Sequence, residues 1–87
     1  MTKTEFIETL FETGSLWFTI AALISSDNDS TVESYTKRLE ILTSFNDNID
    51  DATKIPEEDR TKAKSLIENG IDLLTKELDT IKRHEKN

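Results

Sequence analysis

Apolar side chains recur three and four residues apart along most of the chain, a spacing typical of amphipathic helices, and no strand-like alternation occurs. Thr2 and Glu5 have the spacing of a capping box, in which each side chain accepts a hydrogen bond from the other residue's backbone amide. The inward stripe that follows comprises Ile7, Leu10, Gly14, Trp17, Ala21 and Ile24. This pattern predicts a first helix over residues 3–25.

Two further amphipathic segments follow the first. Residues 32–49 place apolar side chains at heptad spacing after a capping sequence at residues 30–33. A third stripe over residues 67–81, broadened by Leu66 and Leu73, follows Pro56 and three acidic residues that favour a helix start. We predict helices over residues 31–47 and 56–84. The whole chain, residues 1–87, is then a single all-α domain folded as an antiparallel three-helix bundle.

A second apolar row lies off the main stripe of the first predicted helix. Leu16, Ile20 and Leu23 form this row, and Trp17 lies beside it. Three helices provide too few neighbours to cover two apolar rows on one of them. We therefore expect these four residues to anchor self-association, giving a homo-oligomer, or contact with a partner; the alternative is that Trp17 is an ordinary core residue. Gly14 either permits close backbone approach or marks a bend.

The charge of the chain is strongly asymmetric. Eighteen acidic and eleven basic residues give a net charge of −7, and the whole excess lies in residues 1–51. Such a field repels nucleic acid and attracts basic surfaces, so we predict a partner protein with a basic surface and no direct nucleic-acid binding.

The candidate partner-binding residues are acids of two groups: those on the first predicted helix have no Lys or Arg four positions later, and those at the end of the second form an acidic cluster. They lie on one face of the first predicted helix and at the end of the second: Glu5, Glu8, Glu12, Asp47, Asp50 and Asp51. The alternative interpretation is that these acids only keep a small protein soluble and help to start a helix.

Signals for catalysis or metal binding are weak. Residues 27–31 and 47–58 imitate calcium-binding loops, but Val32 and Ala52 stand where such loops require glycine. The single histidine, His84, lies near the end of the last helix, where it is poorly placed to be held as a catalytic base. We predict no enzyme activity, no metal and no cofactor.

Features of the sequence also bear on location. The apolar run over residues 16–24 is about half the ~20 residues that a membrane span needs, and acidic residues interrupt the region where a signal peptide would be apolar. The chain has no cysteine. We predict a soluble cytoplasmic protein with no membrane partner.

Size and charge together suggest a class of function. The predicted function is that of a non-enzymatic acidic protein that binds and inhibits a partner by covering its cationic, nucleic-acid-binding surface, as phage-encoded inhibitors of host defence do. The alternatives are an immunity or antitoxin-type protein that neutralises a nuclease toxin, and a structural homo-oligomeric helical bundle.

Overall fold

The computed structural model describes residues 1–25 and 31–85, and all regular structure in these residues is helical. The four helices are α1 (Lys3–Glu12), α2 (Leu16–Ile24), α3 (Val32–Ile49) and α4 (Glu57–Glu85). The all-α class is confirmed, and the bounds of α3 and α4 lie within two residues of those predicted.

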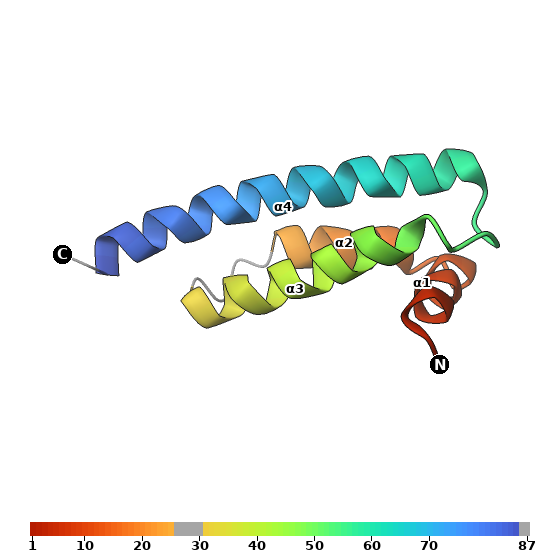
Figure 1. The fold of residues 1–87 in the computed structure, drawn as a ribbon, viewed down its shortest axis with the longest axis horizontal. Helices are drawn as coiled ribbons and strands as arrows, with labels where there is room; N and C mark the ends of the chain where they lie inside the picture. The colour runs from red at the N-terminus through yellow and green to blue at the C-terminus, as the bar shows by residue number, and fades with distance from the viewer. Residues whose placement is uncertain (26–30, 86–87) are drawn as a thin grey trace.

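The helices form an elongated bundle measuring 48 × 19 × 19 Å. Helices α2, α3 and α4 lie along its length, with α3 antiparallel to the other two (Figure 1). Helix α1 instead lies across the end of the bundle where α3 finishes and α4 begins (Figure 1). This end of the molecule therefore brings together four chain segments.

The predicted single helix over residues 3–25 is wrong, because the chain turns by 110° between α1 and α2. Gly14 has φ = +77°, in the left-handed region that glycine enters without steric cost. The Ser15 amide donates to the Leu10 carbonyl at 2.8 Å, and the Gly14 amide to the Phe11 carbonyl at 3.1 Å. These two bonds are the Schellman pattern, which ends a helix. The three-helix bundle is thus corrected to four helices.

The bend also changes which residues of α2 face inward. Leu16 and Ile20 are each 1% exposed and belong to the core, so the expectation that they lack covering neighbours is wrong. Trp17 and Leu23 are half-buried and pack against that core. Ala21, which the uninterrupted stripe placed inward, is exposed.

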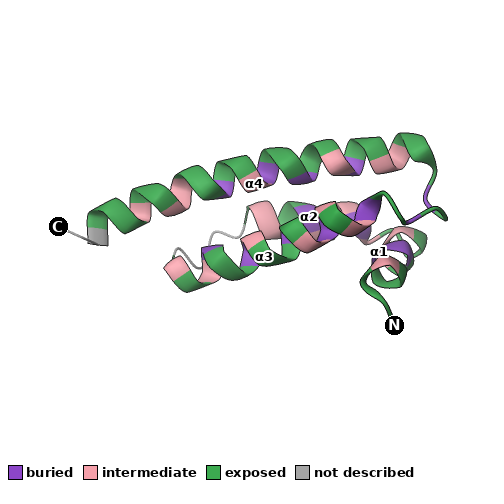
Figure 2. Ribbon diagram, viewed as in Figure 1, coloured by how far each residue is buried: buried purple, intermediate pink, exposed green. Residues whose placement is uncertain are grey.

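The core draws on every helix and on the α3–α4 turn, and it lies on the inward faces of the bundle (Figure 2). Its largest fully buried side chains are Ile7, Leu16, Ile20, Leu42, Ile49, Ile55, Ile67 and Leu74. Helices α2 and α4 pack tightly at Gly70, where an added Cβ would lie 2.5 Å from Cγ1 of Ile24. Packing, rather than backbone conformation, therefore requires glycine at this position.

Helix starts follow local sequence signals. The capping box of Thr2 and Glu5 is present, with the Glu5 amide donating to Thr2 Oγ1 at 3.1 Å. At α3 the cap is Thr31, whose hydroxyl accepts from the Ser34 amide at 3.1 Å. Ser30, the first residue of the predicted capping sequence, lies outside the described residues.

Candidate functional surfaces

The end of the bundle where α3 turns into α4 is highly acidic. Residues 47–59, which we call the acidic end, contain six acids and one base, a net charge of −5. The acids are Asp47, Asp50, Asp51, Glu57, Glu58 and Asp59. The last three lie in the first turn of α4, where the helix dipole favours them. The first three lie at the carboxyl end of α3, where the last turn of the helix contains no basic residue and the dipole opposes acids.

Asp50 differs from its two neighbours because it has a basic partner. Lys64 Nζ lies 2.7 Å from Asp50 Oδ2, and this hydrogen bond raises the pKa of the Lys64 ammonium above its usual value. Asp47 and Asp51 are exposed, and no basic side chain in residues 1–25 or 31–85 lies within 4.0 Å of their carboxylates. Asp47 and Asp51 are therefore the freest of the predicted partner-binding acids at this end.

Glu8 is not a surface acid, contrary to the expectation that it forms part of an exposed row. Its side chain is buried, with 8% of the residue exposed, and its carboxylate accepts a hydrogen bond from the Lys54 amide at 3.0 Å. This bond attaches α1 to the α3–α4 turn. Glu5 is exposed but belongs to the capping box, whereas Glu12 is exposed at the last position of α1.

Replacing Glu8 with Gln is expected to lower the free energy of unfolding by about 1 kcal/mol, because a neutral amide oxygen accepts the Lys54 hydrogen bond less strongly than a carboxylate. Urea unfolding at neutral pH measures the change. Glu12→Gln is the matched control on the same helix, and it should have a smaller effect or stabilise slightly, since it removes a charge that the dipole opposes. Equal losses in the two variants would contradict a specific role for Glu8.

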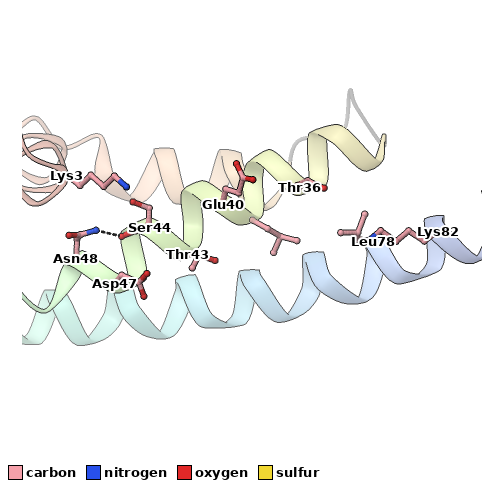
Figure 3. Close-up of a pocket in the computed structure, with 10 residues that line it drawn as sticks. Lys3, Thr36, Glu40, Thr43, Ser44, Asp47, Asn48, Leu78 and Lys82 are labelled. Carbon is pink, nitrogen blue, oxygen red and sulfur yellow. Dashed lines mark hydrogen bonds between the residues drawn. The ribbon is translucent and has the colours of Figure 1, made fainter.

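A shallow groove of about 550 Å³ runs along α3. Glu40 and Asp47 of α3 line it, while Lys3 of α1 and Lys82 of α4 stand towards its opposite ends (Figure 3). The charges are mixed, and the groove is open to solvent.

A buried polar cluster joins the other end of α2 to α3 and α4. The Tyr35 hydroxyl donates to Glu77 Oε2 at 2.5 Å, and the Arg38 guanidinium lies 4.3 Å from the centre of the Tyr35 ring. Arg38 also donates to the Leu23 carbonyl at 3.0 Å. The cluster therefore fixes the register of three helices, which is a structural role.

Alkaline pH is expected to test this cluster. The hydrogen bond to the Glu77 carboxylate, followed by burial, raises the pKa of Tyr35 above its ordinary value, although Arg38 partly opposes the shift. The folded state thus favours protonated Tyr35. The stability that Tyr35 contributes is therefore complete below about pH 10 and is lost as pH rises through the raised pKa.

Thermal unfolding from about pH 8 to about pH 11 should show a steeper loss of stability for the native chain than for Tyr35→Phe. Tyr35 is the only tyrosine, so tyrosinate absorbance reports its titration directly. Glu77→Gln should move the midpoint of the tyrosinate titration back towards the ordinary pKa of tyrosine. A titration midpoint at or below that ordinary pKa in the native chain would contradict the hydrogen bond to Glu77.

Within the described residues, no group of three or more His, Cys, Asp or Glu side chains could hold a metal ion. The calcium-like sequence starting at Asp27 lies mostly outside the described residues. His84 is exposed in the last turn of α4. No single described helix is long and apolar enough to cross a membrane; α1 and α2 pass that test only as a bent pair, by length and composition.

No family model, curated protein or solved structure matches this chain. The roles of its surfaces therefore have to follow from the charge and polarity of the residues that they expose.

The structure also shows an apolar surface that the sequence analysis missed. Phe18 of α2 is 76% exposed, and Leu66 and Leu73 of α4 are each 45% exposed. The helical stripe of α4 placed both leucines beside the core, and the uninterrupted first helix hid the outward position of Phe18. The signal that could have revealed this surface is Gly14, because ending a helix there restarts the pattern at Leu16.

Proposed function

We propose that this protein is a non-enzymatic binding protein that covers a basic surface on another protein with its acidic end. The observation that carries the proposal is the net charge of −5 over residues 47–59. Helix initiation accounts for the acids of α4 but not for Asp47 and Asp51 near the carboxyl end of α3, where acids lower helix stability by about 0.3–1 kcal/mol each. Binding to a cationic partner gives these acids a use that folding does not.

The partner that fits this charge is a protein whose basic surface binds nucleic acid. Acidic residues at one end of a narrow molecule attract such a surface over about 8 Å at physiological salt, and they compete with phosphates for the same Lys and Arg side chains. The protein then acts as an inhibitor, in the manner of phage-encoded proteins that block host defence.

The first experiment identifies the partner by capture from the native host at low salt, followed by release at high salt and mass spectrometry. The dissociation constant of the purified complex is then measured for the native chain and for Asp47→Lys/Asp51→Lys. We expect the variant to bind at least about tenfold more weakly, chiefly through slower association.

The matched control is Glu68→Lys/Asp79→Lys, which makes the same change in charge at exposed positions of α4 outside the acidic end. It should alter the dissociation constant by less than about threefold. Equal weakening by both variants, or binding that does not change with salt, would refute the proposal. If the captured partner still bound nucleic acid when saturated with this protein, the inhibitory part would be wrong.

A further inference from the structure

One side of the bundle carries large apolar side chains that nothing in the described chain covers. We call this side the α2–α4 face and define it by Trp17 and Ala21 of α2 and Leu66 and Leu73 of α4. Trp17 is half-buried and the other three are exposed. Exposed leucines beside a half-buried Trp on one side of a small protein indicate a contact surface more often than chance.

These residues lie together rather than scattered. Trp17 and Leu66 line the same shallow hollow. One turn further along, Ile24 packs on Gly70, which lies between Leu66 and Leu73 on α4. In α2, Ala21 follows Trp17 by one helical turn, so both lie on the flank next to α4. The face therefore runs continuously from one leucine to the other.

The charges around this face identify its occupant as a second copy of the chain. Helix α2 carries no charged residue, so two copies of this acidic chain can meet there without bringing like charges into contact. The first turn of α4 is acidic and its last turn is basic. By their helical positions, Glu58, eight residues before Leu66, and Arg83, ten residues after Leu73, lie on the same flank of α4 beside the leucines. A two-fold axis near Asn69 and Gly70 therefore brings each acidic turn level with the basic turn of the other copy.

We propose that two copies of this chain form an antiparallel two-fold dimer through the α2–α4 face, with Leu66 of each copy packed against Leu73 of the other. In a two-fold interface, the same patch contacts itself with its residues exchanged. Asp47 and Asp51, which the test of the proposed function changes, lie outside the α2–α4 face, so failure of the dimer and failure of the proposed function can be told apart.

The area of the face suits a reversible dimer. At 1.5 Å per residue, α4 is about 43 Å long and α2 about 13 Å, and each helix is about 10 Å wide. With the contact extended from the acidic first turn of α4 to its basic last turn, the two helices together offer about 550 Å² per copy, so a dimer buries about 1,100 Å², near the lower limit for specific interfaces. We expect a dissociation constant in the micromolar range.

Sedimentation equilibrium from about 1 µM to about 500 µM tests the dimer. The 10.0 kDa chain should approach a mass of about 20 kDa as its concentration rises. Leu66→Glu and Leu73→Glu should each weaken the dimer at least about tenfold, because each buries two uncompensated charges per dimer. Ile41→Glu is the matched control, since Ile41 is 42% exposed on α3, outside this face, and should have an effect below about threefold.

Cross-linking tests the antiparallel arrangement without disturbing the fold. The chain has no cysteine, so Leu66→Cys and Leu73→Cys introduce single thiols. A mixture of the two variants should form a disulfide between unlike chains faster than either variant links to itself. This experiment remains informative even if the glutamate variants fold poorly.

Four results would overturn the proposal. The first is a 10.0 kDa particle at the highest concentration. The second is a dimer that the glutamate variants do not weaken, or that Ile41→Glu weakens as much. The third is preferential linkage between like chains. The fourth is a monomer that binds phosphatidylcholine vesicles through Leu73, which would assign the face to a lipid surface.

Discussion

Replacing Leu16 with Ala is expected to lower the free energy of unfolding by about 3 kcal/mol, whereas replacing Phe18 with Ala should change it by less than about 0.5 kcal/mol. Leu16 is 1% exposed in the core, and Phe18, two residues later, is 76% exposed. Truncating a buried leucine loses its transfer free energy and leaves a cavity, while an exposed phenylalanine loses little. For a domain of this size, about 3 kcal/mol corresponds to about 15 °C in melting temperature.

Urea unfolding at about 1 µM protein measures the free energy of unfolding of both variants. This protein concentration is below the range in which we expect dimers. The comparison tests the orientation of α2 directly, because an uninterrupted helix over residues 3–25 would place Leu16 off the inward stripe. A larger loss for Phe18→Ala than for Leu16→Ala would show that α2 presents a different face to the core.

The second large effect is expected where Gly70 of α4 packs against Ile24 of α2. Gly70→Val should lower the free energy of unfolding by about 2–3 kcal/mol, because forcing extra carbon into a packed interface typically costs about 1–3 kcal/mol. An added Cβ would meet Cγ1 and Cδ1 of Ile24 at 2.5 and 2.6 Å. The usual gain in helix propensity on replacing glycine, below about 1 kcal/mol, is too small to offset this clash.

A double-mutant cycle with Ile24→Ala identifies the cause of the loss. Ile24→Ala removes the two atoms that an added side chain would meet, so Gly70→Val should cost at least about 1 kcal/mol less in that background. Additive effects of the two changes would mean that the loss arises elsewhere than in the contact between α2 and α4.

The parts of the fold that the sequence predicts well depend on neighbouring residues. The capping pair Thr2 and Glu5 and the start of α4 after Pro56 both depend on residues within one helical turn. Spacing alone captures such interactions. For the same reason the bounds of α3 and α4 differ little from the prediction.

The split of the first helix could not be decided from spacing. A glycine within a helix costs only about 1 kcal/mol, so a continuous helix and a helix ended at Gly14 are both compatible with the local sequence. Burial of Leu16 and Ile20 decides between them, and it requires α3 and α4 to be in place. Tertiary packing therefore overrides a stripe that looked continuous.

The candidate acids also divide into those whose position the sequence predicts and those whose position depends on tertiary contacts. Exposure of Asp47 and Asp51 agrees with the predicted surface, and their use in binding remains a prediction. Glu8 was misassigned because its partner, the Lys54 amide, lies 46 residues away in sequence. Asp50 likewise pairs with Lys64 across the α3–α4 turn. Contacts of this length become visible only once the helices are packed.

The hydrogen bond between Glu8 and the Lys54 amide makes that single amide a reporter of how often the amino-terminal helix detaches. When α1 lifts away, the amide proton loses its acceptor and exchanges with deuterium from the solvent, even while α3 and α4 stay packed. The exchange rate at Lys54, compared with that of an amide in the middle of α4, thus separates fraying of one end of the molecule from unfolding of the whole.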